Sequence, residues 1–378
     1  MNIVIASDSY KGSLSSMEAG EACKEGILRV MPEASVTVKP MADGGEGTVT
    51  ALVDALGGSW HSKAVHDPFG NMTEATYAVS SDGGTAVMEM AEASGIHYSD
   101  CVPQSVLRAS TYGTGELILD ALDQGVREFI VGIGGSATND AGTGMLRALG
   151  VSFLDTQGKE LPEGGAALTK LAAIELEGMD VRLKECRFRI ACDVENPLTG
   201  PNGASAVYGP QKGAGEEEVA LLDRALKQFA EVAEDTLKMD LDRPAGAGAA
   251  GGLGAAFLGF LPSDLEKGAV IVSDVTNLAE SLKEADLVIT GEGGINHQTV
   301  YGKTPIHVAK LAKELRNDVP VIALCGCIEP GYETVFDGGI DAVFSTVDRP
   351  GRLQDLQKTA AENVARTAEN VARLMKFC

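Results

Sequence analysis

The stretch NIVIASDSYKGSLS at residues 2–15 decides the fold of this chain. Its apolar run fits a buried strand, and the polar turn that follows leads into an amphipathic segment from about Ser15 to Val30. A second apolar stretch, SVTVKP, follows at 35–40. A strand, a helix and another strand in this order predict a parallel sheet covered by helices.

The same alternation returns at the other end of the chain. DLVITG at 286–291, VPVIALCG at 319–326 and DAVFS at 341–345 are apolar runs separated by amphipathic segments, one of them from about Thr304 to Leu315. Both ends therefore predict one doubly wound domain, formed by residues 1–65 and 269–378.

The middle of the chain has a different pattern. ATYAVS at 75–80 and TAVMEM at 85–90 alternate in a way that suits antiparallel strands, and glycine-rich turns and longer helices follow. We predict a second α/β domain with a mixed sheet, inserted at 66–268, and an active site in the cleft between the two domains.

The composition of the chain limits which partners it can bind. The net charge of -23 argues against binding to nucleic acid or anionic membranes, which both need basic patches. No stretch of about 18 apolar residues is present, and the N-terminus resembles a strand rather than a leader, so we expect a cytoplasmic protein. Seven dispersed cysteines indicate free thiols, and a homo-oligomer remains open.

The turn GIGGSATNDAGTG at 132–144 follows an apolar strand and precedes a helix. Glycines allow a phosphate to approach the backbone, and polar side chains at a helix start can bind it. We predict that five residues here bind ATP and that Asp140 binds a metal ion. The five predicted ATP-binding residues are Gly134, Gly135, Ser136, Thr138 and Asn139.

Two polar turns follow the first two predicted strands, DSYKGSLS at 8–15 and ADGGEGT at 42–48. Ligands of open α/β sheets bind at the carboxyl ends of the strands. We predict Lys11 and Asp43 as catalytic residues, with Asp43 also a Mg²⁺ ligand. Asp8 and Glu46 are predicted to bind the substrate.

Three further segments carry polar side chains: ACDVENPLTG at 191–200, GPQKGA at 209–214 and GEGGINHQTVYGKTP at 291–305. The last is not a P-loop, because His297 stands where a glycine is needed. From these segments we predict Asp193 as a catalytic residue and metal ligand, Lys212 and Lys303 as ATP-binding residues, and Asn196 and Gln298 as substrate-binding residues.

Together these segments resemble the bacterial type I glycerate kinase family along nearly the whole chain. The blocks that carry the resemblance are DSYKGSLS, ADGGEGT, GTGELI at 113–118, GIGGSATNDAGTGM, ACDVENPLTG with GPQKGA, GAGAAGGLGAA at 246–256, and ITGEG with GKTP. The resemblance implies a flavodoxin-like domain facing a second α/β domain. It also implies phosphorylation of D-glycerate by ATP, with Mg²⁺ serving the phosphoryl transfer.

One block departs from the family pattern. After GEG the family has Arg, Ile and Asp, whereas this chain has Gly294, Ile295 and Asn296. We expect Asn296 to occupy a catalytic position. If the family carboxylate is the general base, Asn296→Asp should raise kcat with little change in melting temperature.

Two other functions fit parts of the sequence. Gly132, Gly134 and Ala137 match the GxGxxA turn of a NAD-dependent oxidoreductase, with Asp155 about twenty residues further on. The other possible function is that of a catalytically impaired homologue that binds small acids. This function is favoured only if Asn296 indicates that catalysis has been lost.

Overall fold

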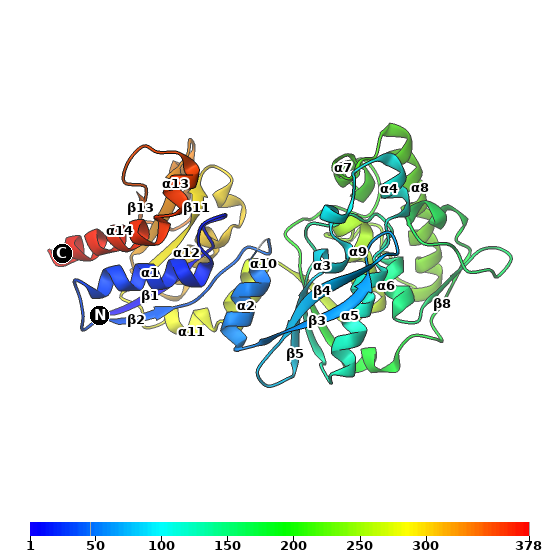
Figure 1. The fold of residues 1–378 in the computed structure, drawn as a ribbon, viewed down its shortest axis with the longest axis horizontal. Coiled ribbons are helices and arrows are strands. Elements are labelled where there is room, and N and C mark those ends of the chain that lie inside the picture. Colours follow the sequence, from blue (N-terminus) through cyan, green and yellow to red (C-terminus); the bar gives the residue numbers. More distant parts are fainter. Residues whose placement is uncertain (46, 378) are drawn as a thin grey trace. The chain divides into compact units, whose positions relative to one another are not determined.

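The computed structural model describes residues 1–45 and 47–377. The chain divides into two compact units, one made of Met1–Gly57 and Gly268–Cys378 and the other of Gly58–Lys267 (Figure 1). The elements of the first unit, with 3-10 helices written η, are β1 (Asn2–Ser7), α1 (Ser16–Leu28), β2 (Ser35–Val38), α2 (Thr48–Leu56), α10 (Gly268–Val275), α11 (Leu278–Leu282), β11 (Leu287–Ile295), η5 (Thr299–Tyr301), α12 (Thr304–Leu315), β12 (Val321–Ile328), η6 (Tyr332–Val335), β13 (Ala342–Ser345), α13 (Leu353–Gln357) and α14 (Ala360–Met375).

The second unit contains a larger set of elements. They are β3 (Ser59–His66), β4 (Met72–Val79), β5 (Thr85–Glu89), α3 (Ala91–Ser94), η1 (Ile96–Tyr98), α4 (Pro103–Arg108), α5 (Tyr112–Asp123), β6 (Glu128–Gly132), α6 (Thr143–Ala148), β7 (Ser152–Leu154), η2 (Gly165–Lys170), β8 (Ala173–Glu175), η3 (Val181–Glu185), β9 (Arg187–Ala191), α7 (Ala204–Tyr208), η4 (Pro210–Lys212), α8 (Glu216–Leu237), α9 (Ala249–Phe260) and β10 (Ser263–Glu266). No helix in the described part of either unit is long and apolar enough to cross a bilayer.

The sheet of the first unit has the strand order β13-β12-β11-β1-β2, and every neighbouring pair is parallel. Read from β2, this is the 2-1-3-4-5 order of flavodoxin-like folds. Strands from both ends of the chain therefore share one sheet, which confirms the predicted doubly wound, flavodoxin-like fold.

Helices α1 and α14 cover one face of this sheet. Apolar side chains of β1, such as Ile3 and Ile5, pack in one core with Ile27 of α1 and with Val364 and Val371 of α14. Successive strand residues point to opposite faces, so alternate positions of β1 reach these two helices. The AENVAR segment, which occurs at 361–366 and again at 368–373, thus serves core packing.

The sheet of the second unit is mixed, with the strand order β10-β9-β6-β5-β4-β3. The pairs from β5 to β10 are parallel, whereas β3 and β4 run antiparallel to their neighbours. Strand β3 pairs with β4 along its whole length. The predicted boundary at residue 65 was therefore too late, because hairpin pairing ties Ser59–His66 to the second unit.

A glycine-rich kink at the start of α9 brings that helix against the turn after β6. Ala250, Gly251 and Gly252 have left-handed backbone conformations. A Cβ on Gly251 would lie 2.1 Å from the carbonyl oxygen of Thr138, so a side chain has no room there. The glycine-rich segment at 246–256 thus packs tightly against the turn after β6.

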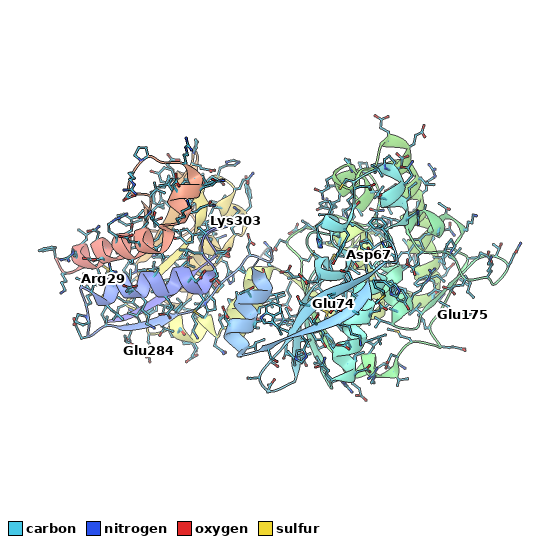
Figure 2. The ribbon with its side chains drawn as sticks, viewed as in Figure 1. Arg29, Asp67, Glu74, Glu175, Glu284 and Lys303 are labelled. Carbon is cyan, nitrogen blue, oxygen red and sulfur yellow. The ribbon has the colours of Figure 1, made fainter. Side chains whose placement is uncertain are left out.

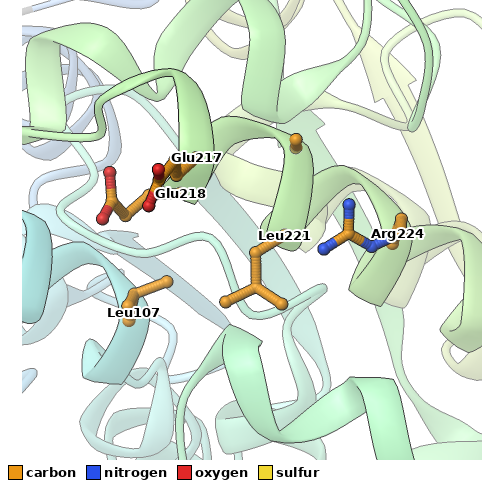
Figure 3. A pocket seen from close by; sticks show the side chains of 6 residues that line it. Leu107, Glu217, Glu218, Leu221 and Arg224 are labelled. Carbon is orange, nitrogen blue, oxygen red and sulfur yellow. The ribbon is translucent and has the colours of Figure 1, made fainter.

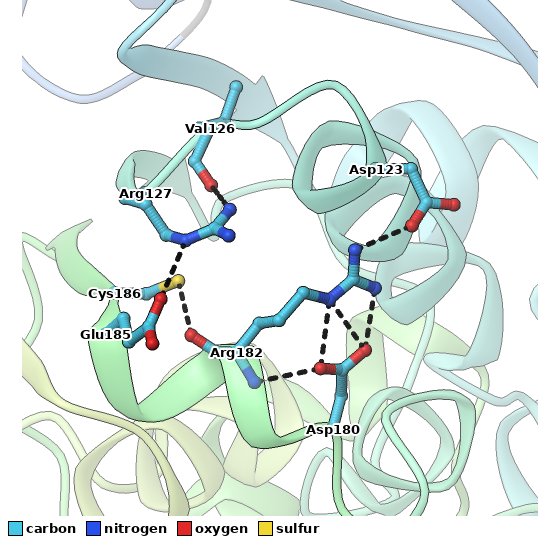
Figure 4. Close-up of polar contacts among 7 residues, drawn as sticks. All are labelled: Asp123, Val126, Arg127, Asp180, Arg182, Glu185 and Cys186. Carbon is cyan, nitrogen blue, oxygen red and sulfur yellow. Dashed lines mark hydrogen bonds and ion pairs between the residues drawn. The ribbon is translucent and has the colours of Figure 1, made fainter.

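Salt bridges tie the amino-terminal ends of β6 and β9 to the helices around them (Figure 4). Arg182 of η3 binds Asp180 and reaches Asp123 at the end of α5 through a 2.8 Å contact. Arg127, next to β6, pairs with Glu185, next to β9. This edge is structural, whereas predicted site residues of this unit, such as Asp193 after β9, lie beyond the opposite ends of the same strands.

Candidate active-site residues

In the first unit, the predicted site residues gather at the carboxyl ends of β1 and β11. The strands that follow β1 in the chain lie on opposite sides of it, so β1 and β11 form the topological switch point where ligands of such sheets bind. Asp8 directly follows β1, and its backbone N–H donates to Gly291 of β11. Glu292 is the next residue of β11, which continues to Ile295, so two carboxylates lie on adjacent strands where β1 ends.

Asp8 is almost fully buried and is held from two sides. Its Oδ1 accepts a hydrogen bond from the backbone N–H of Ser9 at 2.6 Å, and its Oδ2 accepts one from Thr304 Oγ1 at 2.7 Å. Burial raises the pKa of Asp8 to about 6, and the nearby charge of Asp43 acts in the same direction. The two hydrogen bonds oppose this shift. The pair of hydrogen bonds orients Asp8 at the switch point.

Glu292 is buried as well, and it is paired. Its Oε1 accepts a hydrogen bond from Thr299 Oγ1 at 2.8 Å, and its Oε2 lies 3.3 Å from Lys303 Nζ. Burial raises the pKa of Glu292, whereas Thr299 and Lys303 lower it. Lys303, labelled in Figure 2, precedes α12 and has a side chain that is one-third exposed. It can therefore meet both Glu292 and an anion in solvent.

The remaining predicted residues of this unit differ in how exposed they are. Lys11 is exposed, and Asp43 is half-buried, with Oδ1 accepting from the backbone N–H of Gly45. The negative charge of Asp43 reaches both Asp8 and Glu292. Glu46 lies outside the described residues. The switch point thus combines three carboxylates with two lysines near it in the chain.

The side-chain amide of Asn296 makes two hydrogen bonds. Its Nδ2 donates to Glu329 Oε2 at 2.6 Å, and its Oδ1 accepts from the backbone N–H of Gln298 at 2.8 Å. Gln298 itself is exposed. An aspartate at position 296 could not donate to Glu329, so the amide has a structural reason that the sequence alone did not reveal.

In the second unit, the turn after β6 separates into an exposed and a buried part. Gly134 and Gly135 are exposed, and Gly135 has a positive φ of 71° that a side chain would strain. Ser136, Thr138 and Asn139 are buried. The backbone of the two glycines is therefore the part of this turn that an anion can reach.

Lys212 lies beneath this turn rather than in solvent. It is 1% exposed, and its Nζ donates to Ser136 Oγ at 2.8 Å and to the carbonyl oxygen of Thr138 at 2.6 Å. Burial lowers the pKa of Lys212 to about 7, and the charge of Asp140 opposes that shift. We predicted direct ATP binding by Lys212, Ser136, Thr138 and Asn139, but their burial points to support of the turn instead.

Asp140 has a structural role at the end of this turn. It is fully buried, and its carboxylate accepts hydrogen bonds from the backbone N–H groups of Thr111, Gly142 and Gly144 and from the Thr111 hydroxyl. Burial raises the pKa of Asp140, and these hydrogen bonds lower it. Nothing in this geometry supports the predicted metal ligation by Asp140, because the chain itself occupies both oxygens.

The segment after β9 places Asp193 and Asn196 near the turn after β6, since β6 and β9 are parallel neighbours. Asp193 is exposed. Asn196 is held in its loop, donating to the carbonyl of Asn202 and accepting from the hydroxyl of Tyr208 at 2.6 Å. Of the two, Asp193 is the better placed to meet a ligand.

Magnesium needs fewer protein ligands than zinc or calcium does. Within residues 1–45 and 47–377, no three His, Cys, Asp or Glu side chains gather as a metal-binding group. Mg²⁺ is commonly held by one or two carboxylates together with water and substrate phosphates. Asp43 and Asp193, which keep some exposure, fit that role.

A shallow pocket of about 450 Å³ lies elsewhere in the second unit (Figure 3). Its lining residues are Leu107, Glu217, Glu218, Ala220, Leu221 and Arg224. None of them was predicted to act in catalysis. The pocket borders the start of α8, where the acidic side chains do not favour an anionic ligand.

The alternative of a NAD-dependent oxidoreductase is not supported. A dinucleotide site needs the acidic residue at the end of the next parallel strand of the same sheet. Here β7, which precedes Asp155, pairs antiparallel with β8 in a separate sheet. Asp155 holds its own turn by accepting from the backbone N–H groups of Gln157 and Lys159.

Sequence reasoning missed the threonines that hold the carboxylates in place. Thr304 binds Asp8, Thr299 binds Glu292, and Thr111 binds Asp140. Only GKTP at 302–305 gave a signal, because a polar residue and a proline together mark a helix start. The other two contacts join segments whose proximity depends on the fold.

Fold and site together define a two-unit α/β protein with a carboxylate-rich switch point and an exposed glycine turn at parallel strand ends. The profile of the glycerate kinase family matches residues 3–376, and the chain belongs to this family.

Similar proteins align with this chain along nearly its full length. The "Glycerate kinase" of Haemophilus influenzae is 49% identical, covering 100% of this chain and 99% of the relative. The "Glycerate 2-kinase" of Escherichia coli is 45% identical, covering 98% and 97%. The crystal structure of putative glycerate kinase 2 from Salmonella typhimurium LT2 is similar with a TM-score of 0.91 and 46% identity, covering 100% and 98%.

Proposed function

We propose that the protein transfers the γ-phosphoryl group of Mg-ATP to a hydroxyl of D-glycerate, giving phosphoglycerate and ADP. The observation that carries this proposal is the switch point, where the charges of Asp8, Asp43 and Glu292 act on one another and Lys303 pairs with Glu292. Phosphoryl transfer requires groups that place a metal ion and cations that balance phosphate charge. This chain belongs to the glycerate kinase family, and its switch point contains carboxylates and a lysine of this kind.

The residues divide by what each can offer. Asp43 in the first unit and Asp193 in the second are each proposed as a ligand of Mg²⁺, which neutralises the charge that develops on the phosphates. Lys11 and Lys303 supply positive charge to an anionic ligand, and the backbone of the Gly134–Gly135 turn can donate hydrogen bonds to phosphate oxygens.

Polar side chains near the switch point could bind the substrate. Asp8 offers a carboxylate to a glycerate hydroxyl, and exposed Gln298 offers an amide. Asn196 holds its loop through its own hydrogen bonds, so its effect on substrate would be indirect. Because ATP is the phosphoryl donor, we place the reaction in the cytoplasm.

A relative's name supports one of the two hydroxyls as the acceptor. The Escherichia coli protein is called a glycerate 2-kinase. We propose the 2-hydroxyl for this chain as well.

The direct test is to incubate the protein with D-glycerate and Mg-ATP and to identify the product by ³¹P and ¹H NMR. We expect stoichiometric ADP and 2-phosphoglycerate. Formation of 3-phosphoglycerate would keep the kinase and change the acceptor. If neither ADP nor a phosphoglycerate forms, the kinase function is wrong for this chain; ligand-induced thermal stabilisation by ATP or glycerate alone would then indicate a binding protein.

A further inference from the structure

Thr304 joins the start of α12 to the end of β1 within the first unit. It is the first residue of α12, and it is 0% exposed. Its hydroxyl donates to Asp8 Oδ2, whereas the other oxygen of the same carboxylate, Oδ1, accepts from the backbone N–H of Ser9. The carboxylate of Asp8 is thus held by its own turn and by a residue 296 positions away in the chain.

The start of the helix fixes the position of Thr304. Lys303 has an extended backbone, and its carbonyl closes the first turn of α12 by accepting from the backbone N–H of Ile306. Pro305 lies in this turn, where a proline presets the helical backbone angles. A β-branched side chain also has few rotamers. The hydroxyl of Thr304 therefore has little freedom to turn away from Asp8.

The backbone of Asp8 is fixed as well. Its N–H donates to the carbonyl of Gly291, and its own carbonyl accepts from the hydroxyl of Ser7. Strands β1 and β11 are in parallel register at this point, and α12 packs against both of them. The contact between Thr304 and Asp8 is therefore built into the packing of the helix on the sheet.

The carboxylate of Asp8 keeps acceptor positions for a ligand. An ionised carboxylate has about four such positions. Among the described residues, Asp8 accepts two hydrogen bonds, whereas Asp140 accepts four. Asp8 can therefore accept a further hydrogen bond from a ligand hydroxyl, which Asp140 cannot.

Asp8 needs hydrogen-bond donors to remain ionised at neutral pH. Burial raises its pKa to about 6, and the negative charges of Asp43 and Glu292 act in the same direction, whereas the two hydrogen bonds oppose the shift. The charged groups that surround Asp8 are Asp43 after β2, Glu292 of β11, and Lys303, which pairs with Glu292. A hydrogen bond to an ionised acceptor is stronger than one to a neutral acceptor. The Thr304 hydroxyl therefore stabilises the carboxylate more than the carboxylic acid.

We propose that Thr304 is a positioning residue that keeps Asp8 ionised and orients it to accept a hydrogen bond from the substrate hydroxyl. This inference rests on the proposed function, in which Asp8 binds glycerate. All of the residues that carry it belong to the first unit.

The first measurement needs no substrate. Aspartate carboxyl groups are labelled with ¹³C, the signal of Asp8 is identified by its loss in Asp8→Asn, and its chemical shift is followed from pH 4 to pH 9. Thr304→Val removes the hydroxyl and keeps the branched shape, whereas Thr304→Ser keeps the hydroxyl. Thr367→Val is the matched control, because the Thr367 hydroxyl donates to a backbone carbonyl within α14 of the same unit. Thermal unfolding midpoints establish that each variant is folded, and Thr304→Ala replaces Thr304→Val if valine prevents folding.

We expect the wild-type signal of Asp8 to titrate with a midpoint near pH 6. The midpoint should move to higher pH in Thr304→Val, because the buried carboxylate then loses a donor. Thr304→Ser and Thr367→Val should keep the wild-type midpoint. A midpoint in Thr304→Val that equals or lies below that of the wild type would overturn the proposal.

The second measurement is kcat/KM for D-glycerate from pH 5 to pH 8, which reports ionisations of the free enzyme. Wild-type kcat/KM should fall as the pH decreases through about 6, because Asp8 becomes protonated. In Thr304→Val the fall should begin at higher pH, so that kcat/KM at pH 6 is lower than in the wild type by about threefold or more, with a smaller difference at pH 8. Thr304→Ser should restore the wild-type profile.

Two outcomes of the kinetics have separate meanings. A loss in Thr304→Val that is equal at pH 6 and pH 8 would show a purely structural role and overturn the proposal. Absence of turnover in the wild type would refute the kinase function, whereas the titration of Asp8 would still decide whether Thr304 keeps this carboxylate ionised.

Discussion

At the level of single residues, burial decides what each charged side chain can do. Lys212 and Asp140 were both predicted to touch ligands, yet both are inside the protein and bond to the turn after β6. Asp8 and Glu292 are also largely buried, but they lie at the switch point where β1 ends and ligands bind in this fold. The same residue type thus supports a loop in one place and forms the candidate site in another.

Lys212 should make stability depend on pH. Its pKa is about 7 in the folded protein and 10.5 in an unfolded chain, so between these values the unfolded state binds a proton that the folded state does not. Stability gained from this group therefore rises as pH increases from 7 towards 10. We expect the difference in free energy of unfolding between wild type and Lys212→Met, measured by urea denaturation, to shift in favour of wild type from pH 7 to pH 9.

The control for this experiment is Lys310→Met, which changes an exposed lysine on α12. A difference between wild type and Lys212→Met that stays constant from pH 7 to pH 9 would show that Lys212 titrates normally.

Lys11 is predicted to meet an anionic group of substrate or ATP. It is exposed directly beyond β1, and Met preserves its stem while removing the charge. We expect Lys11→Met to reduce kcat/KM at least tenfold, which corresponds to about 1.4 kcal/mol. Lys24→Met, on the exposed side of α1, is the control. A change of less than twofold would assign Lys11 to the surface.

Asn296→Asp should also change stability, which revises the small change in melting temperature expected from the sequence. The new carboxylate would face Glu329, which now accepts a hydrogen bond from the Asn296 amide. We expect the midpoint of thermal unfolding to fall at pH 8 and to recover near pH 4, where carboxylates become protonated. The double variant Asn296→Asp with Glu329→Gln should restore the midpoint at pH 8. An unchanged midpoint in the single variant would mean that this contact contributes nothing to stability.

At the level of elements, helix α14 is held to α1 at very short range, and Figure 1 shows the two helices side by side. Gly26 of α1 lies directly against Ala365 of α14, and Arg29 pairs with Glu369. The glycine allows the backbones to approach, so the terminal helix can cover the sheet. Leu374, near the end of α14, is exposed.

Gly26→Ala should therefore destabilise the first unit. A Cβ at this position would lie 1.9 Å from the carbonyl oxygen of Ala365, and backbone cannot move aside as a flexible side chain can. Overpacking of this kind typically costs about 1–3 kcal/mol. We expect a lower midpoint in thermal unfolding, whereas Glu21→Ala, on the exposed side of the same helix, should change little. Equal midpoints for wild type and Gly26→Ala would show that the two helices can separate without cost.

At the level of the whole molecule, the strong negative charge predicts that phosphate chemistry depends on a cation. The chain carries 54 acidic and 31 basic residues, and the candidate site itself contains several carboxylates. Bringing ATP to such a surface requires neutralisation by a metal ion. We expect turnover to stop in excess EDTA and to return with added Mg²⁺, while EDTA already saturated with Mg²⁺ has no effect. Undiminished turnover in excess EDTA would remove Mg²⁺ from the mechanism.

The sequence by itself determined the secondary structure and its class. Apolar runs separated by amphipathic segments predicted the parallel strands of both ends, and the predicted helix from Thr304 to Leu315 has these bounds in the structure. Such patterns are local, because the period of apolar residues depends only on whether a segment is strand or helix. The polar turns that end the strands also came from local pattern, since strand ends mark ligand sites in this class.

Only the tertiary structure decided which polar residues face a ligand and which support a loop. Lys212 is buried because η4 packs against the turn after β6. These two segments are distant in sequence. The bonds of Thr304 to Asp8 and of Glu116 to His66 likewise join separate segments. Exposure and hydrogen bonding are properties of packing between elements, and no local pattern encodes them.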